Sequence, residues 1–167
     1  MASHPELAIA LCAPANAQQH AQVRTLFTEY AASIGHSPCF TGFEKEIREL
    51  PGEYAGPRGA LLWATVDSAS AGCCALRPLD HSDHANACEM KRLYVRPQFR
   101  GLGLGRQLAE MALETARQIG YSCVLLDTLD DMESARGLYE DLGFVAIAPY
   151  YFNPIPGAHY LKVDLKP

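Results

Sequence analysis

The sequence predicts one α/β (α+β) domain over residues 1–167, built on a mixed, mostly antiparallel sheet of about seven strands with about four flanking helices. Hydrophobic residues recur at three- and four-residue steps in four segments, and they alternate or run together in seven shorter ones. The order is strand, two helices, three strands, helix, strand, helix, two strands, which is typical of a mixed sheet covered by helices. The 167 residues, 49% hydrophobic and 20% charged, are enough for one substantial core.

The first half of the chain contains a strand, two helices and two further strands. A buried stripe from Val23 to Ile34 predicts the long first helix, and Gly35 ends it. A small-residue turn over 67–71 joins the two later strands. The expected elements are a strand over 6–12, helices over 16–34 and 42–50, and strands over 60–66 and 72–79.

The second half begins with a strand that leads directly into a glycine-rich turn. Gly120 and Gly143 end the two helices, and Asp130 is expected to cap the second one, with Glu133 completing a capping box. The expected elements are a strand over 90–95, a helix over 104–119, a strand over 122–128, a helix over 131–142, and strands over 144–148 and 159–165.

Charge and composition exclude several classes of partner. The chain has 14 Lys and Arg against 19 Asp and Glu, a net charge of −5, which is unsuited to a nucleic-acid backbone. No hydrophobic stretch approaches the ~20 residues of a membrane span. The apolar run 7–13 lacks the basic flank of a secretion signal and predicts a strand. The six cysteines form no CxxC pair, which favours a reducing cytoplasm.

The sharpest motif is the glycine-rich segment from Arg100 to Arg106, between a strand and a helix. Its three alternating glycines allow close approach to the backbone, and the start of the next helix offers unpaired N–H groups to a phosphate. A tight turn without a ligand is the alternative. The segment has neither a Walker pattern nor the dinucleotide fingerprint, whose third glycine would fall at Arg106.

Three motifs together resemble the GNAT superfamily of acyl-CoA-dependent N-acetyltransferases. Arg100-x-x-Gly103-x-Gly105 is similar to its signature loop, and Glu89–Pro97 resembles its fourth strand. Ala135-x-x-Leu138-Tyr139-x-x-x-Gly143-Phe144 is similar to its penultimate helix and the strand that follows. The order and spacing agree with the family over most of the chain, so the resemblance implies a GNAT-like fold.

The resemblance also implies acetyl-CoA as co-substrate, with no metal. It places the pyrophosphate on the amides of the loop and the pantetheine arm along the fourth strand, like an added strand. The residues that it assigns to the cofactor are Leu93, Val95, Arg100, Gly101, Gly103, Gly105, Arg106 and Ala135. Many family members have an asparagine where this chain has Met132, whose thioether is a poor hydrogen-bond acceptor.

Two residues are the candidates for catalysis. Tyr139 would donate a proton to the departing thiolate, and its alternative is a core aromatic with a satisfied hydroxyl. Glu89 would act as general base through a water, and its alternative is a solvated carboxylate paired with Lys91 or Arg92. In a regular strand, Glu89 shares a face with Lys91, Leu93 and Val95. Asp127 is the reserve base.

A group of cysteines and histidines offers a zinc site as an alternative. Cys73, Cys74, His81, His84 and Cys88 lie close in sequence, but their spacing fits no common zinc motif. Cys73 and Cys74 are adjacent in a strand, so their side chains are expected on opposite faces. We therefore expect no metal, and place the histidines on a loop near the substrate.

The expected function is transfer of an acetyl group to a primary amine of a small molecule, by direct attack in a ternary complex. The alternatives are a non-catalytic acyl-CoA-binding module and acyl transfer to a hydroxyl. The acceptor pocket is expected from residues 40–54 and from the loops around His81 and 153–157. Four aromatics there suit that pocket, the core or a homodimer interface, namely Phe40, Tyr54, Tyr150 and Tyr151.

Overall fold

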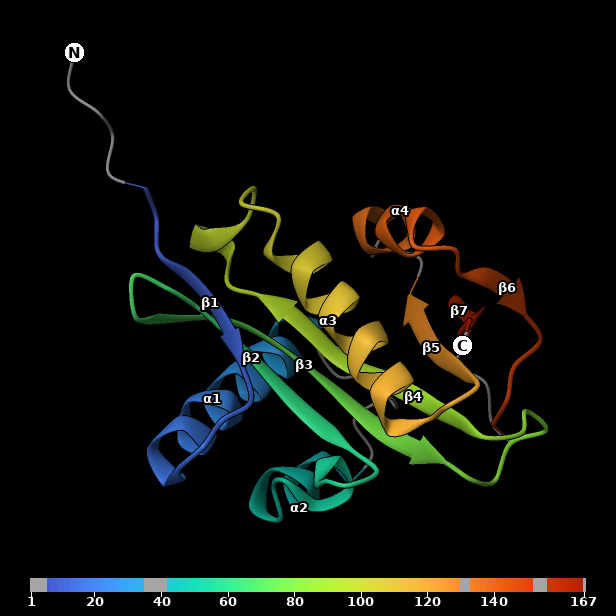
Figure 1. The fold of residues 1–167 in the computed structure, drawn as a ribbon. Helices are drawn as coiled ribbons and strands as arrows, with labels where there is room; N and C mark the ends of the chain where they lie inside the picture. The colour runs from blue at the N-terminus through green and yellow to red at the C-terminus, as the bar shows by residue number, and fades with distance from the viewer. Residues whose placement is uncertain (1–5, 35–41, 130–132, 152–155, 167) are drawn as a thin grey trace.

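The protein is described here by a computed structural model that covers residues 6–34, 42–129, 133–151 and 156–166. One seven-stranded sheet runs through the molecule in the order β1-β2-β3-β4-β5-β7-β6 (Figure 1). Only β4 and β5 pair in parallel, and every other neighbouring pair is antiparallel. The strands are β1 Ile9–Cys12, β2 Ala60–Val66, β3 Ala69–Leu79, β4 Ala87–Val95, β5 Cys123–Leu129, β6 Val145–Ile147 and β7 Ala158–Asp164. This confirms the predicted mixed, mostly antiparallel sheet.

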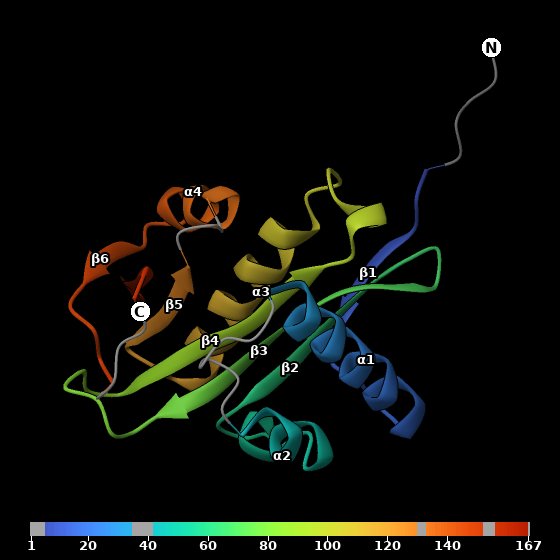
Figure 2. The ribbon, with the colours of Figure 1, turned by 180° about the vertical axis from the view of Figure 1, so that it is seen from behind.

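Helices cover both faces of the sheet. Helices α3 and α4 lie on one face, and α1 and α2 lie on the other, as the two opposite views show (Figures 1 and 2). The four helices are α1 Ala17–Ile34, α2 Phe43–Arg48, α3 Leu104–Ile119 and α4 Glu133–Asp141. Short 3-10 turns occupy Gly52–Tyr54 and Pro97–Phe99. None of the helices in the described ranges is long and apolar enough to cross a membrane.

Each face has its own hydrophobic core. The larger core lies under α3, where Leu104, Leu108 and Ala112 contact the sheet. The second lies under α1 and includes Val23 and Phe27. Cys74 belongs to the first core and Cys73 to the second, which confirms that these adjacent side chains point to opposite faces.

Two strands, β3 and β4, begin three residues earlier than predicted. The β2–β3 turn is only Asp67 and Ser68, both with positive φ (49° and 69°), so β3 begins three residues earlier than expected. Such a two-residue turn matches the twist of the strands that it joins. Strand β4 also begins three residues early, at Ala87, because it pairs with β3 to the end of that hairpin. The expected cap Asp130 lies outside the described residues.

Strands β4 and β5 separate after a short paired segment. They pair at only three positions, and the last pair is Glu89 with Leu125. Beyond that pair, β4 continues to Val95 beside β3, and β5 continues to Leu129 beside β7. We call the opening between these two segments the split. It leaves the facing backbone edges of two central strands without a strand partner.

A β-bulge in β4 corrects one prediction. Cys73 pairs with Tyr94 and Ala75 with Lys91, so two steps along β3 match three along β4. The extra residue is Arg92, whose φ is +62°. An added residue reverses the alternation of side chains. Leu93 and Val95 therefore lie against the α3-side core, not on the face of Glu89, as a regular strand would place them.

Candidate functional site

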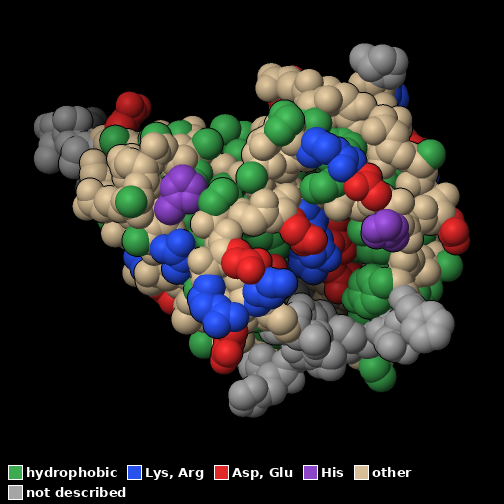
Figure 3. Space-filling model, turned by 90° about the horizontal axis from the view of Figure 1, so that it is seen from below, with side chains coloured by type: hydrophobic (Ala, Val, Ile, Leu, Met, Phe, Trp, Pro, Cys, Tyr) green, Lys and Arg blue, Asp and Glu red, His purple; other side chains and the backbone are tan. Residues whose placement is uncertain are grey.

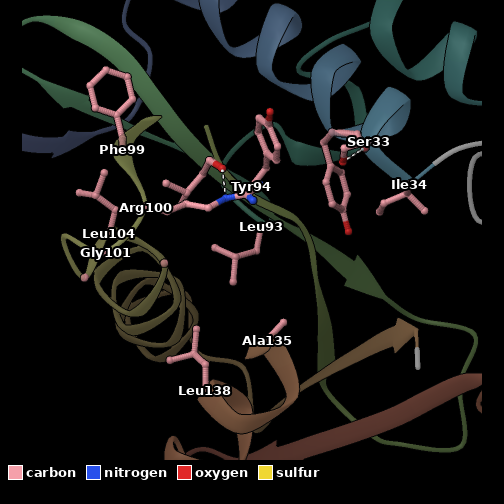
Figure 4. Close-up of a pocket in the computed structure, with 14 residues that line it drawn as sticks. Ser33, Ile34, Leu93, Tyr94, Phe99, Arg100, Gly101, Leu104, Ala135 and Leu138 are labelled. Atoms are coloured by element: carbon pink, nitrogen blue, oxygen red, sulfur yellow. Dashed lines mark hydrogen bonds between the residues drawn. The ribbon is translucent and has the colours of Figure 1, made fainter. Parts of the chain in front are cut away.

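A cavity of about 580 Å³ lies at the open end of the split. It is bounded by the end of β4, the loop before α3, the start of α4 and the end of α1. Figure 4 shows Ala135 and Leu138 of α4 across from Leu93 of β4 and Leu104 of α3. Its remaining lining residues are Tyr30, Ser33, Ile34, Tyr94, Val95, Phe99, Arg100, Gly101, Gly103 and Gly105.

The glycine loop ends in an uncapped helix N-terminus. Gly101 and Gly103 have φ of +86° and +79°, a conformation that L side chains rarely adopt. No side chain caps α3 at Gly103. The first N–H groups of α3 are therefore unpaired by the helix and carry its positive dipole end. Gly105 has no such constraint, because a Cβ there would meet only Leu138 and Val95, at 3.9 and 4.0 Å.

The backbone of β4 presents two residues to the split. Arg96 N–H donates to the Ala71 carbonyl of β3 (2.8 Å). Because partners alternate along an antiparallel strand, the polar groups of Leu93 and Val95 point away from β3. The Val95 carbonyl accepts a hydrogen bond from Arg100 Nε at 3.1 Å, which Figure 4 marks with a dashed line. Arg100 thus closes over the end of β4.

Arg106 lies beside the same cavity but is held by the protein. Its guanidinium donates to Asp141 at the end of α4 (2.9 Å), and both side chains are about half exposed. This ion pair joins the start of α3 to the end of α4. The Arg106 backbone N–H belongs to the uncapped first turn and is separate from that contact.

Tyr139 faces the protein interior from α4. The residue is 6% exposed, and its ring contacts Phe144 edge to face. Burial, with the neighbouring Tyr30, raises the pKa of Tyr139 well above 10. Within the described part of the chain, its hydroxyl makes no hydrogen bond. The hydroxyl is therefore protonated at neutral pH, and Tyr139 is not one of the residues that line the cavity described above.

Glu89 lies at the apex of the split, on the α1/α2 face. It is 1% exposed and bonds to Arg77 Nε through Oε1 (2.7 Å) and to the Tyr150 hydroxyl through Oε2 (2.6 Å). Lys91 Nζ lies 3.8 Å from Oε1. Burial alone raises the pKa of Glu89, but Lys91, Arg77 and the Tyr150 hydrogen bond outweigh it and leave the pKa below 4.5. The carboxylate is ionised at neutral pH.

Asp127 occupies the matching place on β5. It is two residues beyond the last β4–β5 pair, and the Tyr151 hydroxyl donates to it at 2.8 Å. Tyr150, Tyr151 and Tyr160 contact one another edge to face, with centroids 5.2–5.6 Å apart. Tyr150 thus donates to Glu89 on the β4 side of the split, and Tyr151 donates to Asp127 on the β5 side.

Other predicted pocket residues lie elsewhere or outside the description. Tyr54 is buried in the α1-side core, against Phe27, and donates to Glu46. His81 is exposed in the β3–β4 connection. Phe40, Met132 and residues 153–155 lie outside the described residues.

The described cysteines and histidines form no cation site. No group of three metal-ligating side chains comes together in the described ranges. Burial raises the pKa of Cys74 and of Cys88 to about 12, so both remain thiols at neutral pH.

Three contributions to this site were not predicted from the sequence. Tyr30, Ser33 and Ile34 reach the cavity from α1, although they are far from the loop in sequence. Arg77 pairs with Glu89 across two strands. The bulge at Arg92 did leave a signal, because the apolar residues on the α3 side occur at 88, 90, 93 and 95, with one step of three.

Comparisons with known proteins agree with this geometry. A model of the Acetyltransferase (GNAT) family matches residues 22–144. An uncharacterised N-acetyltransferase of Schizosaccharomyces pombe is 37% identical over 143 residues, 85% of this chain and 86% of that protein. The human N-acetylaspartate synthetase is 33% identical over 113 residues, 67% of this chain but 36% of that protein.

Solved structures share the fold at lower identity. A GNAT-family acetyltransferase of Staphylococcus aureus has a TM-score of 0.77 at 19% identity, covering 95% of this chain and 100% of that one. The PaiA N-acetyltransferase of Thermoplasma acidophilum, solved with coenzyme A, has a TM-score of 0.70 at 15% identity, covering 94% and 99%. Together with the family match over residues 22–144, these likenesses show that the chain belongs to the GNAT family of acetyltransferases.

Proposed function

We propose that the protein transfers an acetyl group from acetyl-CoA to a primary amine of a small molecule, by direct attack in a ternary complex. The single observation that carries the proposal is the split itself. It begins at an uncapped helix N-terminus on the α3 side and ends at the ionised Glu89 on the opposite face. A donor and an acceptor that enter from opposite faces would meet at its apex.

The residues around the split fit coenzyme A. The unpaired amides at the start of α3, with Gly101, Gly103, Gly105 and Arg106, suit a pyrophosphate. The outward backbone groups of Leu93 and Val95 suit an extended arm that pairs as an added strand. Ala135 leaves room for that arm on the α4 side. When bound there, acetyl-CoA supplies an acetyl thioester.

Two side chains would handle the protons. Glu89 is ionised but weakly basic, so its role is to attract the acceptor's ammonium group and to pass a proton on through water. Tyr139 is buried and protonated, and it would donate a hydrogen bond or its proton to the sulfur that departs. Burial raises the pKa of the Cys74 and Cys88 thiols to about 12, which makes an acyl-cysteine step at either of these two residues unfavourable.

A small amine is favoured over a macromolecular acceptor. The net charge of −5 does not suit nucleic-acid-associated targets. The printed name of the human relative, N-acetylaspartate synthetase, denotes an acetylated small molecule, and this supports the same class here. The alternatives are acyl transfer to a hydroxyl and acyl-CoA binding without chemistry.

The test is release of the CoA thiol from acetyl-CoA with a panel of amines and alcohols. We expect turnover with amines, and we expect Tyr139→Phe to lower kcat by roughly 10- to 100-fold. The affinity for CoA, measured by calorimetry, should change less than about twofold, because the variant keeps the ring against Phe144. Binding of acetyl-CoA without turnover would support the non-catalytic module, and turnover with alcohols alone would support O-acylation.

A further inference from the structure

The side chain of Lys91 is mostly buried, and its ammonium group has no hydrogen-bond acceptor among the described residues. The side chain is 13% exposed. Its nearest carboxylate oxygen, Glu89 Oε1, lies 3.8 Å away, beyond hydrogen-bond distance. Among the described residues, no other group accepts a hydrogen bond from Lys91 Nζ. The ammonium still reaches solvent at this point, so its N–H groups are available to an anionic group of a ligand.

Glu89 does not fill this role, because its shorter contacts to Arg77 and Tyr150 leave its nearest oxygen 3.8 Å from Lys91 Nζ. Oε1 accepts from Arg77 at 2.7 Å, and Oε2 accepts from Tyr150 at 2.6 Å. Arg77 in turn is shared with Glu53, at 2.6 Å. Glu53, Glu89 and Arg77 are thus paired with one another through short contacts. The ammonium group of Lys91 keeps N–H groups that can donate to a further acceptor.

Lys91 also lies where an acceptor would bind. It pairs with Ala75, directly before the bulge residue Arg92, on the same face as Glu89 and at the apex of the split. Asp127 and the tyrosines of the β6–β7 connection lie on this face too. Seen from below, this side of the molecule gathers acidic and basic side chains around a hollow (Figure 3).

We propose that Lys91 binds a carboxylate of the acceptor, and that the acceptor is an amino acid or another amine with a carboxylate near its amino group. This inference rests on the function proposed above. The amino group would face Glu89 while the carboxylate reaches Lys91, so neighbouring opposite charges on β4 match neighbouring charges of the substrate. A singly charged carboxylate fits better than a phosphate, because Glu89 lies close enough to repel a dianion.

The experiment compares amino acids with amines that differ only by loss of the α-carboxylate. The pairs are L-leucine with isoamylamine, L-phenylalanine with phenethylamine, L-glutamate with 4-aminobutyrate, and L-lysine with cadaverine. For each we would measure thiol release, and calorimetric binding in the presence of CoA. In the wild type, we expect at least one amino acid to exceed its partner by about tenfold or more in kcat/KM and in affinity.

Lys91→Met keeps the long apolar stem and removes the charge. We expect the preference for the amino acid to fall to within about twofold, while the carboxylate-free amine is little affected. The variant also changes the surroundings of Glu89, but that effect acts on both members of a pair and cancels in their ratio. Lys45→Met is the matched control, because Lys45 is an exposed lysine that lines the neighbouring cavity between α2 and β3.

Failure of this inference is distinguishable from failure of the proposed function. Acetylation of amines with no preference for the carboxylate, or a preference that persists in Lys91→Met, overturns the inference and leaves the transferase intact. Binding of an amino acid that depends on Lys91, without any thiol release, supports the inference and overturns the proposed function. If no amino acid binds the wild type more tightly than its partner amine, the inference is wrong, and this comparison needs no variant to fold.

Discussion

The two faces of the sheet at the β4–β5 split differ in what they present. At the open end of the split, the cavity between α1, α3 and α4 is formed largely by backbone groups and small or apolar side chains, such as Leu93 and Ala135. On the α1/α2 face, the same split ends among buried charges that include Glu89 and Arg77. The bulge at Arg92 lies between the two faces. It turns the side chains of Leu93 and Val95 toward the α3/α4 face, whereas Glu89 and Lys91 point to the α1/α2 face.

The difference indicates how one fold can keep the same donor site, at the start of α3, while the acceptor site around Glu89 varies. Backbone N–H groups at a helix start bind a phosphate whatever the neighbouring side chains are, so that face depends on conformation. The other face depends on side chains from four separate segments, held by mutual ion pairs and by Tyr150. A substitution there changes recognition without changing the fold.

Gly103→Ala is expected to have the largest effect, which is a loss of CoA affinity at the start of α3. At φ +79° an alanine is strained by roughly 1–2 kcal/mol, and relaxing that strain turns the amides at the start of α3 away from the cavity. We expect the Kd for CoA, measured by calorimetry, to rise by about tenfold or more.

Gly120→Ala is the matched control at the other end of α3. Gly120 has φ +107°, and a Cβ there would meet nothing within 4 Å, as at Gly103. Both variants should lower Tm to a similar degree, but Gly120→Ala should change the CoA Kd by less than about twofold. Equal losses of CoA affinity in the two variants would show that strain, and not the loop amides, is responsible.

A smaller effect is expected on the charged face from Tyr150→Phe. The hydroxyl stabilises the ionised form of Glu89 more than the protonated form, so its loss raises the lowered pKa of that carboxyl toward the ordinary range. The acidic limb of kcat/KM should therefore move up by about one pH unit. A lowered folded-state pKa stabilises the protein above the ordinary pKa, so the variant should lose about 1–2 kcal/mol of unfolding free energy at pH 7.

That stability difference should shrink as the pH falls through the pKa of Glu89 in the folded wild-type protein, because the protonated acid gains less from the hydroxyl. Urea unfolding at several pH values measures it. Tyr151→Phe is the control, since Tyr151 bonds Asp127 and not Glu89. If Tyr151→Phe moves the acidic limb and Tyr150→Phe does not, Asp127 is the relevant carboxylate and Glu89 has a structural role.

The two faces also differ in how far the sequence predicts them. The strands, the helices and the glycine loop follow from local patterns, because periodicity and turn residues act within a few positions. The structure places Gly101, Gly103 and Ala135 around one cavity, as the motifs predict. The bulge was not predicted, although the three-residue step from Met90 to Leu93 marks it, so the expected face of Leu93 and Val95 was wrong.

The charged face was not predictable in the same way. Arg77 and Glu89 are 12 residues apart, and Tyr150 and Glu89 are 61 apart, so their contacts follow from strand order and not from any short motif. Burial is likewise a tertiary property. A glutamate at the start of a strand is usually solvated, yet Glu89 is almost fully buried by segments that a local pattern cannot bring together.

The smallest effect is expected from the ion pair between Arg106 and Asp141, at the edge of the α3/α4 face. Arg106→Gln and Asp141→Asn both remove the exposed ion pair between α3 and α4, so each should change the unfolding free energy by less than about 1 kcal/mol. Only Arg106→Gln also removes a positive charge beside the uncapped helix start. We expect it to weaken CoA binding by a few-fold at low salt, with less effect at high salt, because exposed charges are screened.

Asp141→Asn should leave CoA affinity unchanged or slightly higher, since it frees Arg106. Equal weakening in both variants would mean that the ion pair acts by positioning α4, and that the Arg106 charge does not face the phosphate.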